Sequence, residues 1–364
     1  MSGAPGLLAP GSRVIRVRTA SLVLLPRIAW LSLAALVLLL AAVAGHLMLA
    51  GRPVQLSQVL AAFMDDPALP RAVRLTVLEF RLPRTIAGAV AGACLAVAGG
   101  LTQTIARNPL ATPEVLGVTA GASTGAVAVL VLAGAGHGGA SGLAAAVGMP
   151  VASAVGALGT GTAVFLLTYR RAQQGFDSMR LVLVGLGAAG LASSTTIWLL
   201  TLGDVTNASQ AITWMMGSLN GKDWGAVVPA LLASVPLLAV AGACGRWLLI
   251  SAFDDDTARS LGLPLGRSRP LLLVLAVLLA AVGTVLAGPV AFVALLCPLA
   301  ARFAGRTVVP SLGLTALLGA AFVVLSDLIA GFLLPHALPV GVFTTVLGAP
   351  VLIALVFRSQ KRTI

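Results

Sequence analysis

The chain has 364 residues, of which 59% are hydrophobic, 41 are glycine and only 9% carry a charged side chain. Soluble globular domains average about 25% charged residues and about 45 to 50% apolar ones, so this composition excludes a water-soluble fold. The 23 basic and 11 acidic residues leave a net charge of +12, which in a soluble protein would suggest a nucleic-acid partner.

Apolar runs follow one another along nearly the whole chain, and about 20 such residues cross a bilayer. Proline, glycine and charged clusters divide the runs. We therefore expect an all-α, polytopic membrane protein with about ten transmembrane helices and little room for a soluble domain. The expected spans are 28–50, 85–106, 115–134, 143–168, 180–202, 225–249, 270–287, 289–304, 308–331 and 338–357.

The basic residues predict how these spans are oriented. Ten spans place both ends of the chain on one side, and with that side as the cytoplasm 17 of the 23 basic residues lie inside. The net charge then needs no nucleic-acid partner, and membrane lipid is the expected surrounding. The expected organisation is a cytoplasmic segment 1–27, a transmembrane domain 28–357 and a cytoplasmic tail 358–364.

Residues that could carry chemistry are sparse. The three cysteines and three histidines are scattered without a CxxC pair, so we expect no disulfide framework and no metal site. The one Gly-Lys pair, Gly221-Lys222, is followed by Asp223, so the chain has no nucleotide-binding P-loop. Among the predicted spans only one acid occurs, Asp327, about four residues from an outer end, whereas ion-driven carriers usually need ionisable groups nearer the midplane. If ATP supplies the energy, another chain hydrolyses it.

Two segments between spans stand out. Residues 208–221 are too short to cross and too apolar for a plain loop, which predicts a short re-entrant or interfacial helix outside, ending near Asn220-Gly221. The cytoplasmic loop 253–269 begins with three aspartates and continues to Gly262, the pattern of a short capped helix. Such a helix could offer Leu261, Leu263 and Leu265 to a partner; the alternative is a solvated loop.

Motifs from one end of the chain to the other resemble those of one membrane-protein family, the iron-siderophore and cobalamin permeases of ATP-binding-cassette importers (the FecCD type). The resemblance is greatest to the second permease chain of ferric enterobactin-type importers. The motifs are RLPR at 81–84 with Gly88 and Gly92, Gln103 with RNPLA at 107–111, LG at 116–117 with GA at 121–122, WMMGSL at 214–219 with Trp224, ARSLG at 258–262 with RSR at 267–269, GPVAF at 288–292, and LPVG at 338–341 with GAP at 348–350.

This resemblance implies a ten-span permease subunit in a bacterial cytoplasmic membrane that carries ferric siderophores. Its partners would be a second permease subunit, two ATPase subunits and an extracytoplasmic binding protein. The chain itself would be no enzyme and bind no cofactor, since ATP and Mg would sit on the ATPase. Alternatives are a cobalamin or heme permease of the same family, an ion-coupled secondary carrier, and a membrane scaffold that transports nothing.

The resemblance also implies roles for particular residues. Arg81 and Arg84 would dock the binding protein, with lipid-headgroup anchoring as the alternative. Loop 253–269 would be the coupling helix that sits in a cleft of the ATPase, and segment 208–221 would border the outer gate, with simple packing as the alternative. The coupling residues would be Asp256, Ala258, Arg259, Ser260, Leu261, Gly262 and Leu263; the gate and path residues would be Met215, Met216, Leu219, Asn220 and Asn108, although Asn108 with Pro109 also suits a turn.

The chain departs from the family pattern at three points. Gly331 stands where an arginine usually follows the intramembrane acid, Ala337 replaces an acid, and the Pro-His expected near Cys297 is absent. A homodimer would lack these groups twice, so the departures favour a heterodimer with a second, different permease chain. They also suggest that the docking surface is incomplete without that partner.

Overall fold

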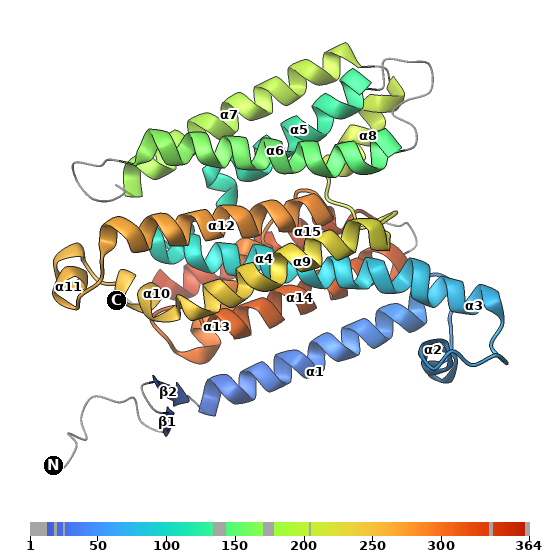
Figure 1. The fold of residues 1–364 in the computed structure, drawn as a ribbon, viewed down its shortest axis with the longest axis horizontal. Coiled ribbons are helices and arrows are strands. Elements are labelled where there is room, and N and C mark those ends of the chain that lie inside the picture. The colour runs from blue at the N-terminus through green and yellow to red at the C-terminus, as the bar shows by residue number, and fades with distance from the viewer. Residues whose placement is uncertain are drawn as a thin grey trace.

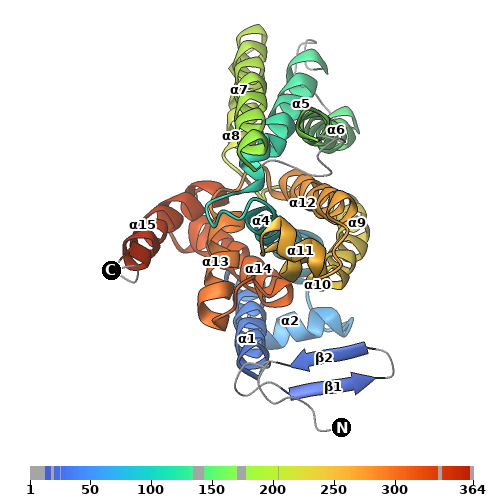
Figure 2. The same cartoon turned by 90° about the vertical axis from the view of Figure 1, so that its left-hand side faces the viewer.

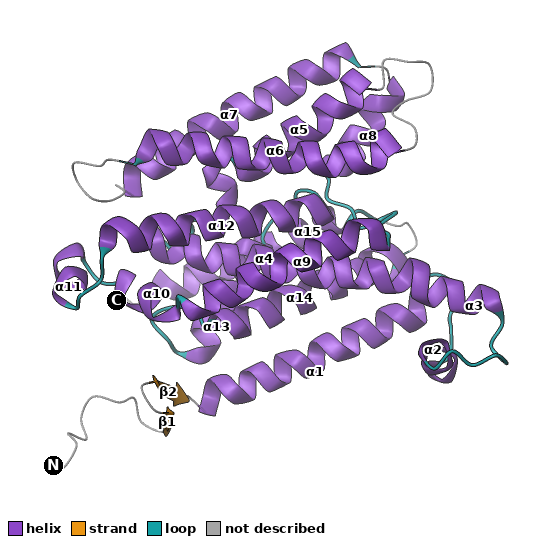
Figure 3. Cartoon of the chain, viewed as in Figure 1, coloured by secondary structure: helices purple, strands orange, loops and turns teal. Residues whose placement is uncertain are grey.

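The computed structural model describes residues 13–17, 20–24, 26–133, 143–169, 178–203, 205–334 and 338–360. Most of the predicted terminal segments 1–27 and 358–364 lie outside these ranges. The described chain is almost entirely helical (Figure 3). Its helices are α1 (Pro26–Leu49), α2 (Leu56–Phe63), α3 (Arg71–Leu75), η1 (Thr76–Arg81), α4 (Leu82–Ile105), η2 (Pro113–Leu116), α5 (Val118–Ala133), α6 (Leu143–Thr168), α7 (Ser178–Leu202), α8 (Val205–Met215), α9 (Trp224–Ala243), α10 (Gly245–Ser251), α11 (Asp255–Ser260), α12 (Leu265–Ala287), α13 (Val293–Gly305), α14 (Leu312–Leu328), η4 (Ile329–Leu333) and α15 (Val340–Gln360).

The helices confirm the predicted polytopic fold. Each of the ten expected spans overlaps a helix, and seven helical stretches of the described chain are long and apolar enough to cross a membrane. The other three expected spans correspond to shorter apolar helices, Val118–Val131, Val293–Gly305 and Val340–Ala354. The structure adds one feature that the sequence analysis missed, an antiparallel hairpin of strands β1 (Arg13–Val17) and β2 (Ala20–Leu24).

Helix α4 is the centre of the larger layer of the fold. It packs against α9, α12, α13 and α14, while α1 lies along α14 (Figure 1). The close approach of α4 to α14 depends on small residues, because a Cβ on Gly92 would overlap the carbonyl of Gly319. Gly92, one of the motif residues, therefore serves helix packing at this contact.

Helices α5, α6 and α7 form a second layer, with α8 beside them (Figures 1 and 2). Here too glycines bring backbones together, since a Cβ on Gly125 would overlap the carbonyl of Ala152. The layer touches the rest of the molecule through α12 and through the short 3₁₀-helix η2, which packs on α7. The chain therefore passes between the two layers at the segment that joins α4 to α5.

The two ends of the helical bundle differ. Helix α11 lies at the end where α1 begins, and α2 and α3 lie at the opposite end (Figure 1). Because the cytoplasmic loops of membrane proteins carry the excess of Lys and Arg, we expect the α11 end to face the cytoplasm and call it the cytoplasmic end. The start of α4 and the end of α14 are then at the outer face.

Candidate functional site

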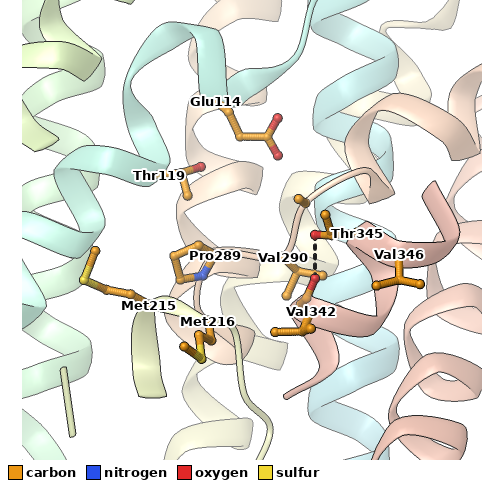
Figure 4. A pocket seen from close by; sticks show the side chains of 11 residues that line it. Glu114, Thr119, Met215, Met216, Pro289, Val290, Val342, Thr345 and Val346 are labelled. Carbon is orange, nitrogen blue, oxygen red and sulfur yellow. Dashed lines mark hydrogen bonds between the residues drawn. The ribbon is translucent and has the colours of Figure 1, made fainter. Parts of the chain in front are cut away.

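A cavity of about 380 Å³ opens where the two layers meet (Figure 4). Three segments far apart in the sequence contribute to it: the end of α8, the turn before α13 and the start of α15. The helix η2 adds Glu114, which alone is charged among the described residues that line the cavity. The lining residues are Glu114, Thr119, Met215, Met216, Pro289, Val290, Ala291, Gly341, Val342, Thr345 and Val346.

Glycines allow these three segments to cross at backbone distance. Gly217 has φ +74° and the amide of Gly341 donates to its carbonyl at 3.3 Å. A Cβ on Gly341 would overlap the carbonyl oxygen of Met216, and one on Gly288 would lie 2.6 Å from that of Trp214. The motifs WMMGSL, GPVAF and LPVG therefore form one junction that only glycine permits.

Only some of the residues expected at the outer gate line the cavity. Met215 and Met216 line the cavity, with their sulfur-bearing chains on its α8 side (Figure 4). Leu219 does not: it is buried and reaches the Gly88 face of α4. Asn220 is exposed at a turn, where its amide donates to the Ser218 hydroxyl at 3.1 Å.

The expected boundaries of the gate helix were wrong. Helix α8 covers Val205–Met215, whereas the sequence suggested an end near Asn220-Gly221. Gly217 and Gly221 both take positive φ, +74° and +69°, and this conformation breaks the helix before the turn that leads into α9. The helix is therefore shorter and its last residues, rather than the middle of the segment, meet the cavity.

Asn108 lies at a turn and not at the gate. Its side-chain oxygen accepts the Leu110 amide at 2.9 Å, and its carbonyl accepts the amide of Ala111 at 3.1 Å. The residue borders a different cavity of about 200 Å³ toward the cytoplasmic end, together with Arg107 and Arg302. The turn interpretation of Asn108 and Pro109 thus agrees with the geometry.

Arg81, an expected docking residue, is directed into the protein. Its side chain donates to the carbonyls of Leu47 at 2.6 Å, Met48 at 3.3 Å and Arg52 at 2.6 Å, and the residue is 5% exposed. The last carbonyls of a helix have no partner within the helix, so Arg81 satisfies those at the end of α1. Arg81 offers no surface to a partner protein in this structure.

Arg84 forms a partly buried ion pair within the protein. It binds Asp327 through two hydrogen bonds, Nε to Oδ2 at 2.7 Å and Nη2 to Oδ1 at 2.8 Å. The imidazole of His46 lies 2.9 Å from the same Oδ2, and its other nitrogen lies 2.8 Å from the Thr85 hydroxyl. The guanidinium also lies over the ring of Phe332, 4.8 Å from its centroid.

His46 and Asp327 form a pairing that the sequence analysis missed. It treated His46 as one of three scattered histidines and Asp327 as an isolated acid. The available signal was that both are polar residues near the outer ends of apolar spans, where buried ionisable groups are expected to pair with one another. Which spans are neighbours, however, is a property of the tertiary fold.

The segment expected to couple to an ATPase forms a short helix, α11, at the cytoplasmic end. The Asp254 carboxylate accepts the Thr257 amide at 2.9 Å and caps the helix, and this hydrogen bond lowers the pKa of Asp254. Gly262 ends the segment with φ +79°. Leu261 projects outward with 51% of its surface exposed, and Asp256, Arg259 and Ser260 are exposed beside it.

The expectation that this helix offers three leucines to a partner was wrong for two of them. Leu263 and Leu265 are each 4% exposed, and they pack with Ala258 against Trp247 and Ile250. These residues form the base that holds α11 against the bundle. Of the seven coupling residues named from the sequence, Ala258 and Leu263 are therefore buried, and the other five remain on the surface.

Asp255 is a further charged residue of this helix, and the sequence analysis did not select it. Its carboxylate accepts hydrogen bonds from Arg107 at 2.7 Å and from Arg269 at 2.6 and 3.1 Å. Hydrogen bonds from Arg269, and then from Arg107, lower the pKa of Asp255 to about 2. Across the described residues, no group of three or more His, Cys, Asp or Glu side chains is placed to hold a metal ion.

Comparison with known proteins gives consistent matches over most of the chain. Residues 35–358 match the FecCD transport family. The ferric enterobactin transport system permease protein FepG of Escherichia coli (strain K12) is 36% identical over 307 residues, which cover 84% of this chain and 89% of FepG. The probable siderophore transport system permease protein YfhA of Bacillus subtilis (strain 168) is 35% identical, covering 79% of this chain and 83% of YfhA.

Two further proteins are similar to the chain. The vitamin B12 import system permease protein BtuC of Salmonella paratyphi A is 34% identical, covering 79% of this chain and 85% of BtuC. A solved inward-facing structure assigned to the metal-chelate type of ABC transporter superposes with a TM-score of 0.77 at 23% identity. The superposition covers 91% of this chain and 99% of that one, so the two share a fold.

Proposed function

Since the chain belongs to the FecCD transport family, we propose that it is the membrane permease subunit of an ATP-binding-cassette importer for ferric siderophores. The observation that carries this proposal is its similarity to FepG and YfhA over about four fifths of the chain. The structure supports it with a cavity between two helical layers and an exposed helix, α11, on the cytoplasmic side. The chain is a multi-pass protein, and the proposed location is the bacterial inner membrane.

The proposed partners follow from this role. ATP and Mg bind to two separate ATPase subunits, and an extracytoplasmic binding protein delivers the siderophore. This chain contributes the path and performs no chemistry. Leu261 and the exposed residues around it form the proposed contact with the ATPase, because an exposed leucine rimmed by charges suits a partner's apolar cleft.

Docking of the binding protein is proposed for Arg84 alone of the two arginines. Arg84 keeps part of its side chain accessible, whereas the Arg81 guanidinium is occupied by backbone carbonyls. Binding a partner's carboxylate would require Arg84 to leave Asp327, and His46 would then remain as the hydrogen-bond partner of that acid. Docking is therefore expected to compete with the internal ion pair.

A heterodimer is the proposed assembly. Gly331 occupies the position where the family usually has an arginine, and a Cβ there would lie 3.2 Å from Nη2 of Arg84. The Arg84 guanidinium thus already fills the space beside that position. A second permease chain that carries the missing arginine and acid would complete the docking surface.

An ion-coupled carrier is not favoured. The acid of the predicted spans, Asp327, has both carboxylate oxygens bound by Arg84 and one also bound by His46. An ion pair held in this way is suited to fixing three helices together rather than to binding and releasing a driving ion. Family membership points in the same direction.

Reconstitution in liposomes tests the proposal. Vesicles that contain the permease pair and the ATPase, with binding protein and ferric siderophore outside, should accumulate iron only when ATP is enclosed. Vesicles with this chain alone and a proton or sodium gradient should accumulate none. Gradient-driven uptake by the chain alone would overturn the proposed function, and uptake of cobalamin or heme in place of the siderophore would reassign its substrate.

A further inference from the structure

Three segments that are distant in the sequence meet at one carboxylate. Arg107 follows α4, Asp255 opens α11 and Arg269 lies in the first turns of α12. Nη2 of Arg107 is 2.7 Å from Oδ1 of Asp255, and Arg269 binds both oxygens, at 2.6 and 3.1 Å. Nε of Arg107 also donates to the Ser251 carbonyl, at 3.3 Å. We call Arg107, Asp255 and Arg269 the cytoplasmic cluster.

Because Arg269 is buried, its ion pair with Asp255 is costly to break. The Arg269 side chain is 5% exposed, and that of Asp255 is 41% exposed. A buried guanidinium without its counter-ion is costly, whereas an exposed pair contributes little. The neighbouring pair of Arg259 with Asp256 is of the exposed kind, with side chains 50% and 95% exposed. Asp255 is therefore the acid that fixes α11 to α12. In the described part of the chain, Asp256 pairs only with an exposed arginine of its own helix and does not hold α11 to the bundle.

Arg107 carries this connection into the segment that crosses between the two layers. Its backbone has φ +48°, a left-handed conformation that side chains other than Gly rarely take, and the turn of Asn108 follows at once. The segment then enters η2. Only a short segment with a tight turn separates Arg107 from η2. A displacement of α11 that moves Arg107 should therefore also move η2.

The helix η2 is in turn tightly seated on the second layer. A Cβ on Gly185 of α7 would overlap the Val115 carbonyl, and a Cβ on Gly117 would lie 3.2 Å from the Ala189 amide nitrogen. Glu114 of the same helix lines the cavity between the layers (Figure 4). One continuous path of contacts therefore runs from α11 through Arg107 and η2 to α7 and the cavity wall.

We propose that the cytoplasmic cluster is the joint that transmits movement of α11 to η2, and through η2 to the layer of α5, α6 and α7. Arg107 and Asp255 are positioning residues in this account: they touch no solute, and they set how far α11 and the cavity wall move together. The inference rests on the proposed function, because it assumes that an ATPase moves α11.

Arg107→Gln is the sharpest variant, because it leaves the bond of Asp255 to Arg269 and so keeps α11 anchored. In the complete importer in liposomes, we expect ATP hydrolysis within about twofold of the unaltered complex and siderophore uptake at least tenfold lower. Arg107→Lys should restore part of the uptake. Asp65→Asn is the matched control, because it removes an ion pair with Arg74 at the outer face and should leave uptake and hydrolysis unchanged.

Three outcomes decide the proposal. Lower uptake per ATP hydrolysed in Arg107→Gln, with normal assembly, supports the joint. An unchanged ratio of uptake to hydrolysis, even with a lower melting temperature, shows that the cluster only stabilises the loop and overturns it. If the unaltered complex shows no ATP-driven uptake, the proposed function itself fails, which is a separate result.

A second measurement keeps the test independent of uptake. Leu110 lies in the segment between Arg107 and η2 and is exposed, so a spin label at Leu110→Cys reports on that segment. With the cytoplasmic cluster unaltered, ATP should hardly change the distance between labels at Ser260→Cys and Leu110→Cys, because α11 and this segment move together. In Asp255→Asn the distance should change with ATP, and a distance that stays fixed in that variant would contradict the joint.

Discussion

Several arginines of this chain are held by partners within the protein. Arg81 binds the end of α1, Arg84 binds Asp327, and Arg269 binds Asp255. In a low-dielectric setting an unpaired charge is costly, so each of these residues is held by partners from another element. Residue identity alone shows that such groups need partners, but it does not show which ones they find.

The ion pair of Arg84 with Asp327 is expected to be a major local contribution to stability. Asp327→Asn leaves the Arg84 guanidinium facing an uncharged group, which should lower the free energy of unfolding by about 3 kcal/mol. The double variant Arg84→Leu with Asp327→Leu should recover most of that loss, because it removes both charges together. Unfolding in detergent with increasing denaturant measures both, and equal losses in the two variants would contradict the pairing.

The pH dependence of Asp255 has a definite sign. Its pKa is lowered from 3.8 to about 2, so ionised Asp255 stabilises the fold above about pH 4. That contribution is lost as the pH falls from about 4 through about 2, and it stays constant between pH 5 and 8. The melting temperature of Asp255→Asn should therefore fall below that of the unaltered chain at neutral pH and approach it near pH 2. A difference that grew on acidification would show that the carboxylate is not held by the arginines.

At the scale of elements, the segment of α11 has one buried and one exposed leucine with different expected roles. Leu263→Ala removes a buried side chain and should cost about 2 to 3 kcal/mol of stability. Leu261→Ala removes an exposed one and should leave stability within about 0.5 kcal/mol while uncoupling ATP hydrolysis from uptake. Thermal unfolding and transport measured on the same two variants check this division. Normal transport in Leu261→Ala would remove the contact assigned to it.

The junction beside the cavity makes a second prediction about elements. Gly341→Ala places a methyl group on the Met216 carbonyl and should separate α15 from the end of α8, which abolishes uptake. Gly242→Ala in α9 is the matched control, because a Cβ there meets no atom within 4 Å. It should fold normally and be slightly more stable, since Ala has the higher helix propensity. Equal uptake in both variants would show that the junction tolerates a side chain.

The sequence predicted the elements better than their contacts. Apolar runs predicted a helix that the structure shows at each of the ten expected spans, and the aspartates and Gly262 predicted α11, because hydropathy and helix capping are local properties. The end of α8 was misplaced because Gly217 takes a conformation that its neighbours impose. The inward direction of Arg81 and the pairing of His46 with Asp327 depend on which spans pack together, and one sequence does not contain that information.

At the scale of the whole molecule, the two layers and α11 define how the chain is expected to work. The cavity lies between the layers, and the exposed helix lies at the cytoplasmic end. The sequence contains no P-loop motif, and in the proposed function a separate ATPase supplies the movement. A shift of α11 then alters the relation between the layers, which is the change that alternating access requires.

Cross-linking at Leu261 tests directly whether energy enters through α11. Leu261→Cys in inner-membrane vesicles, treated with a short bifunctional thiol reagent, should form a product with the ATPase subunit whose yield changes when ATP is added. The native cysteines Cys94, Cys244 and Cys297 are buried, so the unaltered chain supplies the background. If Leu261→Cys instead reacts with an impermeant reagent from the outer face, or forms no product with an ATPase that co-purifies, the account is contradicted.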